Sequence, residues 1–284
     1  MERFDRDLKS PKFTSYEVSH PQQIVGDFEV AAKEVTVREF EEFLEERTDD
    51  RHLNRAYSRI RENPTKSRMD QSDVVNLPAD GISWYNAVEY CDWLSRRDRL
   101  TSCYRDPRGP DAKVSFAELE NSQSVPVCDR AGSGFRLPTN GEWELACRAG
   151  STTLWPFAND DEYLVKFAAC SKSGGEMLPV GSLRPNALGL FDMLGNVAEL
   201  TDSPSRAVAA GKRVVDLAVR TGDSSLLSFD ARGGGFFESP AFVRPGRRVA
   251  TAIHRDWHRF PEYYGLGFRV VRSLGVESGD SSKR

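Results

Sequence analysis

The chain has 284 residues, of which 39% are hydrophobic, and this is enough for one large domain or two small ones with an ordinary core. Lys and Arg number 39 against 43 Asp and Glu, so the net charge of −4 argues against a general nucleic-acid binder. No apolar run approaches the roughly 18 residues of a membrane-spanning helix, and Met1 is followed by charged residues rather than by a signal segment. The sequence predicts a cytoplasmic protein without a membrane anchor.

The polarity of the chain divides it into three parts. Residues 1–23 are polar and are predicted to form an N-terminal extension. The folded domain is expected over 24–273, beginning with a strand within 23–31. Residues 274–284 form a tail that is too polar to bury.

Two helices are predicted from an N-cap residue that precedes an apolar stripe. Thr36 caps a helix whose apolar face consists of Val37, Phe40, Phe43 and Leu44. Ser83 caps a second helix over 84–96, and its buried stripe is Trp84, Ala87, Val88, Cys91 and Leu94. This spacing places each set on one side of its helix, so both helices are expected to pack against the core.

A third helix is predicted over 141–148. Thr139 and Glu142 have the spacing of a capping box, and Gly150 is placed to close the helix. Elsewhere, short apolar pieces alternate with Gly, Pro, Asn and Asp, which indicates many short strands and long loops rather than a parallel sheet. The segment 101–134 is expected to be irregular, with a small hairpin between 114–116 and 125–127, whereas 207–228 is ambiguous.

The cysteines argue against a disulfide framework or a zinc finger. There are five of them, an odd number, and no two form a C-x-x-C pair. Reduced structural thiols are the favoured interpretation. Cys103 and Cys128 flank a polar loop and are the one pair considered for a bond under oxidising conditions, although sequence alone does not bring them together.

Six segments, in this order, resemble the formylglycine-generating enzymes, also called sulfatase-modifying factors: FEVAAKEVT (28–36), GISWYNAVEYCDWL (81–94), GFRLPTNGEWELACRAG (134–150), PNALGLFDMLGNVAE (185–199), RGGGF (232–236) and GFR (267–269). The resemblance extends over nearly the whole chain. It implies an α+β fold organised like a C-type lectin, with small antiparallel sheets, a few short helices and much loop. The family includes copper-dependent and iron-dependent enzymes as well as members that only bind ligands, so the fold alone does not imply catalysis.

The resemblance also locates the catalytic cysteines of the active enzymes, which lie five residues apart after the glycine turn. Aligned on Gly233–Gly235, those positions hold Glu238 and Val243. A carboxylate and an isopropyl group cannot replace two thiolates that hold Cu(I). We therefore expect no catalytic residues of this type, no copper and no formylglycine formation, which makes the chain a pseudoenzyme. Cys91 and Cys147 match half-cystines of animal members, and the usual partner positions hold Val270 and Arg248.

Two metal sites are considered. His254 and His258 have the i, i+4 spacing of a metal pair on a helix, but Pro261 soon interrupts the segment, and two surface histidines are the favoured interpretation. At the turn over 192–199 the resemblance implies a structural calcium, with side-chain ligands from Asp192 and Glu199 and backbone oxygens from Gly195 and Val197. Hard oxygen ligands at this spacing suit calcium, whereas a tight turn with two exposed carboxylates is the alternative.

The region between the glycine turn and the final GFR combines aromatic residues with arginines. Such a mixture suits recognition, because aromatic rings provide rigid contact area and guanidinium groups provide planar hydrogen bonding. In ligand-binding relatives, including the variable proteins diversified by retroelements, this region forms the binding face, and the segment here looks similar. Phe236, Val249, Leu266, Phe268 and Val270 are expected inside. The predicted binding residues are Phe237, Glu238, Phe242, Arg244, His254, Trp257, His258, Phe260, Tyr263 and Tyr264.

These observations lead to two hypotheses of function. The first is a non-catalytic module of a bacterial protein that binds a protein or a small molecule through the C-terminal loop region, with further domains of a longer parent protein as additional partners. Nucleic acid is disfavoured, because the rest of the chain is acidic. The second is a metal-dependent oxidoreductase with a non-standard active site.

Overall fold

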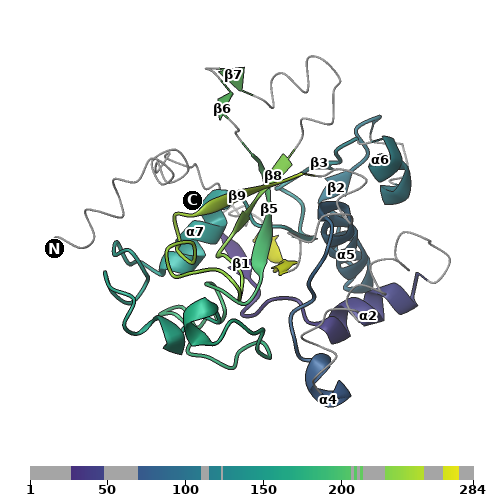
Figure 1. The fold of residues 1–284 in the computed structure, drawn as a ribbon. Helices are drawn as coiled ribbons and strands as arrows, with labels where there is room; N and C mark the ends of the chain where they lie inside the picture. The colour runs from purple at the N-terminus through teal and green to yellow at the C-terminus, as the bar shows by residue number, and fades with distance from the viewer. Residues whose placement is uncertain are drawn as a thin grey trace, which may run out of the picture.

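A computed structural model describes residues 27–47, 70–109, 115–122, 124–205, 208–209, 212–213, 228–252 and 265–274. The predicted N-terminal extension and nearly all of the polar tail lie outside these ranges. The fold is mixed, with few helices, small sheets and long loops (Figure 1). In the described part of the chain, every helix is too short or too polar to cross a membrane.

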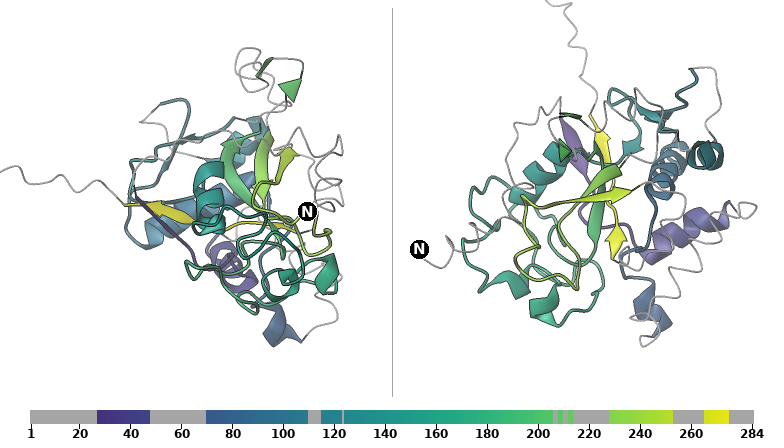
Figure 2. Two further views of the ribbon diagram at one scale, coloured as in Figure 1. Left: turned by 90° about the vertical axis from the view of Figure 1, so that its left-hand side faces the viewer. Right: turned by 45° about the horizontal axis from the view of Figure 1, so that its top comes forward.

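A four-stranded sheet lies at the centre of the molecule. Its strand order is β10 (Leu266–Gly267), β5 (Ala198–Pro204), β8 (Ser228–Arg232) and β9 (Arg248–Ala252). β10 pairs with β5 in parallel, and the other neighbours are antiparallel. In Figure 1 and the right view of Figure 2, this sheet lies between the helices α2 and α5 on one side and the loops of 150–195 on the other.

A second sheet joins the two ends of the described chain. β11 (Val271–Ser273) lies between β1 (Phe28–Val30) and β4 (Phe135–Arg136), and both pairings are antiparallel. The strand predicted within 23–31 therefore exists over its last part, whereas 23–26 lie outside the described residues. Because β11 follows the GFR segment, this sheet fixes where that segment enters the core.

The three predicted helices are confirmed. α2 (Val37–Glu45) and α7 (Asn140–Arg148) begin with complete capping boxes from Thr36 and Thr139, and Ser83 caps α5 (Trp84–Arg97). The end of α7 differs from the prediction, because Ala149 already adopts the left-handed conformation, at φ 48°, one residue before Gly150. The shorter α4 (Gln71–Val74) and the 3₁₀ turns Leu164–Lys166 and Ser171–Ser173 are further helical elements of the described ranges.

The hairpin predicted within 101–134 was placed wrongly. Of its first half, residue 114 lies outside the described residues, and Phe116 begins a helix, α6 (Phe116–Ser122), in which Phe116 and Leu119 have helical spacing and are both buried. The strand that pairs instead is β2 (Tyr104–Arg105), which lies opposite β3 (Val127–Cys128). In the ambiguous segment 207–228, a small hairpin joins β6 (Val208–Ala209) to β7 (Lys212–Arg213).

The buried apolar residues form two clusters. The larger contains the apolar faces of α2 and α5, where Phe40 stacks on Tyr90 and meets Phe268 edge-on with 6.1 Å between ring centroids. The smaller surrounds Trp143, Trp155 and Val243. Of the residues expected inside near the C-terminus, Leu266, Phe268 and Val270 are buried, and Phe236 and Val249 are half-buried.

All five cysteines are free, and four of them are buried. Cys103 and Cys128 do not bond to each other; the Cys103 thiol donates to the carbonyl of Gly134 at 3.2 Å. Burial raises the pKa of Cys91 well above its ordinary value, which keeps this thiol protonated and unreactive. These cysteines therefore act as small core residues.

Candidate ligand-binding site

The glycine turn after β8 shapes the loop that the sequence singled out. Gly233 and Gly234 have φ of 87° and 75°, in the left-handed region that favours glycine. A Cβ on Gly234 would lie 2.7 Å from Glu238 Oε2 and 3.0 Å from the carbonyl oxygen of Phe242. The turn thus depends on glycine, and the chain after it folds back so that Glu238, Phe242 and Val243 lie against Gly234.

Glu238, at the first cysteine position of the active enzymes, holds this loop together. Its Oε2 accepts a hydrogen bond from the Gly235 N–H at 2.9 Å, and its backbone oxygen accepts from the Ser171 N–H at 2.9 Å. Burial raises the pKa of the Glu238 carboxyl, against the opposing effects of the Gly235 hydrogen bond and the charge of Arg247. Glu238 therefore closes the turn through its carboxylate and ties it, through its backbone oxygen, to the segment that contains Ser171.

Val243, at the second cysteine position, is a core residue. Its side chain is fully buried in the cluster around Trp143 and Trp155. Its backbone oxygen accepts a hydrogen bond from Trp155 Nε1 at 2.7 Å. Neither position of the expected thiolate pair therefore presents a metal ligand of the required softness.

Phe236 and Phe237 form the exposed edge of the loop. Their rings meet edge-on with 5.2 Å between centroids, and Phe237 is 51% exposed. A Cβ on Gly265 would lie 3.0 Å from Phe237 and 3.3 Å from Phe236, so both rings lie against this glycine. Since Gly265 follows directly on residues 253–264, the predicted binding segment rejoins the described chain beside the two rings.

Two other predicted binding residues have structural contacts. Arg244 is only 5% exposed, and its Nε donates to the carbonyl of Ala241 at 2.8 Å, so it supports the loop from inside instead of presenting a guanidinium to a ligand. Phe242 is half-buried beneath the guanidinium of Arg247, 5.1 Å from the ring centroid. The remaining candidates, His254, Trp257, His258, Phe260, Tyr263 and Tyr264, lie outside the described residues.

The proposed calcium turn is tightly built. Asp192, Gly195 and Asn196 all have positive φ, and a Cβ on Gly195 would lie 2.0 Å from the carbonyl oxygen of Ala169. The Asp192 carboxylate accepts from the Gly181 N–H at 2.6 Å. Both oxygens of Glu199 accept from the guanidinium of Arg269, at 2.6 and 2.7 Å, and one also accepts from an indole N–H.

The charges around this turn suit a cation, but the oxygens of Glu199 are already bound. Burial, together with the charges of Asp192 and Glu199, raises the pKa of Glu34. Burial likewise raises the pKa of Asp192, against the opposing charges of Arg269 and Lys33. Within the described ranges, no group of three or more His, Cys, Asp or Glu side chains is arranged to hold a metal ion. Calcium stays a prediction here, with Asp192 better placed than Glu199 to act as the ligand.

Sequence reasoning missed the buried charges behind the loop. Arg232 is fully buried at the end of β8 and donates to Glu144 at 2.7 Å and to the carbonyl of Pro245. Its guanidinium also lies over the Trp143 ring, 5.1 Å from the centroid. The helical spacing of Glu144 predicted only its place on α7, because its partner lies 88 residues away in the sequence.

Comparisons with known proteins show the family and the fold of this chain. The sequence matches the sulfatase-modifying factor enzyme 1-like domain over residues 6–274. The chaperone protein LppX of Paenibacillus barcinonensis is 29% identical over 43% of this chain, and the aligned region spans half the length of that relative. The formylglycine-generating enzyme of Mycobacterium tuberculosis is 27% identical over 65% of this chain and 68% of its own length.

Two further similarities are with a relative named as inactive and with the solved structure of a variable protein. The inactive C-alpha-formylglycine-generating enzyme 2 of Bos taurus is 27% identical over 75% of this chain and 72% of its own length. The structure of Treponema denticola variable protein 1 covers 92% of this chain and 90% of its own, with a TM-score of 0.66 and 23% identity, which is a likeness of fold. The predicted α+β fold and family are thus confirmed, and the protein belongs to the family of the sulfatase-modifying factor enzyme 1-like domain.

Proposed function

We propose that this chain is a binding module without formylglycine-generating activity, which recognises a protein or a small molecule through the loop region after its glycine turn. Support comes from the family, which contains a relative named as inactive, and from a fold shared with a variable protein. The proposal concerns the described loop 233–243 together with the predicted binding residues within 253–264.

The observation that carries the proposal is the state of the two cysteine positions. Glu238 is used to close the turn, and Val243 is used to fill the core. Formylglycine formation by the active enzymes requires a pair of soft thiolate ligands for copper, and a carboxylate and an isopropyl group do not supply them. What the loop offers instead is an exposed aromatic edge at Phe237, beside Gly265, where an aromatic and arginine-rich segment ends.

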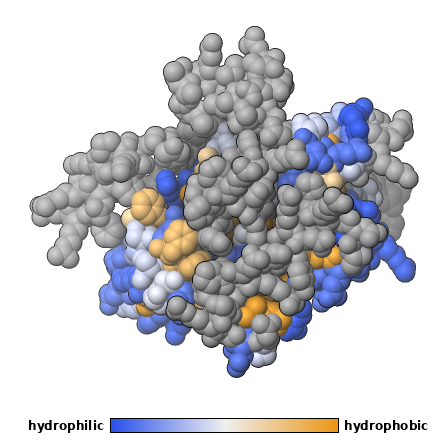
Figure 3. All heavy atoms as spheres, turned by 45° about the vertical axis from the view of Figure 1, so that its right-hand side comes forward, coloured by the Kyte–Doolittle hydropathy of each residue, from blue (hydrophilic) through white to orange (hydrophobic). Residues whose placement is uncertain are grey.

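On the face drawn in Figure 3, the apolar surface of the described residues forms separate patches between hydrophilic ones. The exposed large apolar side chains come from different segments, and Phe237 at 51% is one of the most exposed. Single aromatic anchors surrounded by polar groups are typical of specific recognition sites. This distribution favours a local contact at the loop over a broad apolar interface.

The absence of activity is tested with a cysteine-containing sulfatase peptide in the presence of copper. Mass spectrometry should show no aldehyde product above the background without enzyme, while the mycobacterial formylglycine-generating enzyme serves as the positive control. Aldehyde formation by the purified chain would overturn the proposal. The oxidoreductase alternative predicts stoichiometric uptake of a redox metal after reconstitution with Cu(I) or Fe(II), measured by elemental analysis.

The binding role is tested with peptides selected from a random library against the wild-type chain. Phe237→Ala should weaken the selected peptides by on the order of tenfold or more, because loss of an aromatic anchor typically costs more than 1 kcal/mol. Tyr163→Ala is the matched control, since Tyr163 is a 45% exposed aromatic residue outside the loop. Equal binding to the wild type and to Phe237→Ala would contradict a site at this loop.

A further inference from the structure

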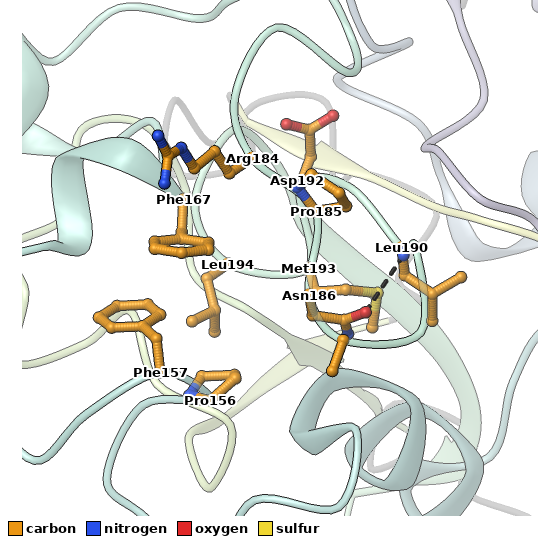
Figure 4. A pocket seen from close by; sticks show the side chains of 11 residues that line it. Pro156, Phe157, Phe167, Arg184, Pro185, Asn186, Leu190, Asp192, Met193 and Leu194 are labelled. Atoms are coloured by element: carbon orange, nitrogen blue, oxygen red, sulfur yellow. Dashed lines mark hydrogen bonds between the residues drawn. The ribbon is translucent and has the colours of Figure 1, made fainter.

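A pocket of about 210 Å³ lies outside the glycine-turn loop (Figure 4). Its walls come from Pro156, Phe157 and Phe167 on one side and from the segment 184–194 on the other. None of the residues that line it belongs to the loop 233–243, so an occupant of this pocket is independent of the binding face proposed above.

The walls of the pocket are apolar. The rings of Phe157 and Phe167 are stacked, with 4.4 Å between centroids and 12° between planes. Across from them in Figure 4 lie Leu190 and Met193, both almost fully buried. A cavity of about 150 Å³ lined by such residues is large enough for benzene, so about 210 Å³ suits one ring with a short side arm.

Hydrogen bonds hold the pocket open in a fixed shape. The Asn186 amide donates to the carbonyls of Ala146 at 2.8 Å and Cys147 at 3.2 Å, which ties the segment to the end of α7. Its side-chain oxygen accepts from the Leu190 N–H at 3.1 Å, the bond drawn in Figure 4. Arg184 is fixed at its backbone, where its N–H donates to the carbonyl of Lys166 at 2.9 Å. A preformed pocket of this kind loses little entropy when it binds a ligand.

The charges at the rim differ in what they can offer a ligand. Arg184 is exposed, and its guanidinium makes no hydrogen bond or ion pair with any described residue. Asp192 also lines the pocket, but its carboxylate accepts from the Gly181 N–H and points away from the two phenyl rings in Figure 4. The Asn186 amide is fully used by backbone groups. The available polar partner is therefore a guanidinium, whose planar fork matches a carboxylate.

We propose that this pocket binds a small apolar carboxylate. The ring or chain of the ligand packs between the stacked phenyl rings and Leu190, and its carboxylate pairs with Arg184. Burial of the apolar part supplies most of the affinity, and the ion pair at the exposed rim selects the acid over neutral analogues.

The test compares 3-phenylpropionate with 3-phenylpropionamide and 3-phenylpropylamine, using ligand-observed NMR titration of the full chain. The acid should bind more tightly than the amide and the amine. Arg184→Gln should weaken the acid about three- to tenfold and leave the amide unchanged, because a rim ion pair contributes on the order of 1 kcal/mol. Arg38→Gln, an exposed arginine on α2, makes the same charge change and should have no effect.

A second variant checks the place of binding. Ala187 is an exposed residue that lines the pocket, so Ala187→Trp should fill the entrance without disturbing the core and should abolish binding of both the acid and the amide. The proposal is overturned if the acid does not bind at low millimolar concentration, if the amide or amine binds as tightly as the acid, or if Arg184→Gln or Ala187→Trp leaves binding of the acid unchanged. Each of these results leaves the proposed loop site untouched, because that site shares no residue with the pocket.

Discussion

Arg269 and Glu199 form a two-point ion pair in which both side chains are almost completely buried. The Arg269 Nη2 and Nε atoms lie 2.6 and 2.7 Å from the two oxygens of Glu199. This pair joins the GFR segment to the turn over 192–199, and the Arg269 guanidinium also donates to the carbonyls of Ala31 and Phe191. One arginine thus connects three distant parts of the chain.

Removal of the Glu199 charge should be costly. Glu199→Gln leaves a buried guanidinium without its counter-charge, so the free energy of unfolding should fall by about 3–5 kcal/mol in urea titration. The control is Glu29→Gln, which breaks the partly exposed pair between Glu29 and Arg272 and should cost less than about 1 kcal/mol. Similar losses in the two variants would show that burial does not distinguish the pairs.

Glu144 gives stability a dependence on pH. Burial alone would raise the pKa of Glu144, but the charge and hydrogen bond of Arg232 outweigh it and lower the pKa below its ordinary value of 4.5. A carboxyl whose pKa is lowered in the folded state stabilises the fold above that ordinary value and loses this contribution as the pH falls. The free energy of unfolding should therefore decrease as the pH drops below about 4.5, and the decrease should be smaller in Glu144→Gln. An equal acid dependence in both proteins would exclude Glu144 as a source.

Calcium at the turn is tested through Asp192, because Glu199 also holds Arg269. If calcium binds, its addition should raise the melting temperature of the wild type, and EDTA should reverse the rise. The gain is on the order of a few kcal/mol when calcium greatly exceeds its dissociation constant. Asp192→Asn should abolish the response. A wild-type melting temperature that neither calcium nor EDTA changes would rule the site out.

Trp257 was predicted from the sequence to face a ligand. Its surroundings alternate charged and aromatic residues without a helical or strand period, so one backbone conformation cannot easily bury every ring while keeping Arg255 and Arg259 in water. Trp257→Ala should therefore change the free energy of unfolding by less than about 1 kcal/mol. Denaturant titration measures it, and a loss of roughly 3–5 kcal/mol would show a core role instead.

The sequence alone determined the features that depend on neighbouring residues. The capping boxes at Thr36 and Thr139 were predicted correctly, because a cap and its partner are three residues apart and their hydrogen bonds form within one helical turn. The apolar stripes of α2 and α5 were predicted for the same reason. The prediction of the hairpin within 101–134 was wrong, because strands of only two or three residues have no periodic signal that would identify the strand with which each one pairs.

Only the tertiary structure decided which distant groups meet. The position of Glu199 in the sequence motif predicts a calcium ligand. In the fold, Arg269, which is 70 residues away, donates hydrogen bonds to both oxygens of Glu199. The mixture of arginines and aromatic residues predicts that Arg244 binds a ligand. In the fold, Arg244 is buried and donates a hydrogen bond to the Ala241 carbonyl. The pocket between Phe157 and Leu190 had no sequence signal, because its walls come from loops without periodicity. Contacts across long loops depend on how the whole chain closes, which local spacing does not encode.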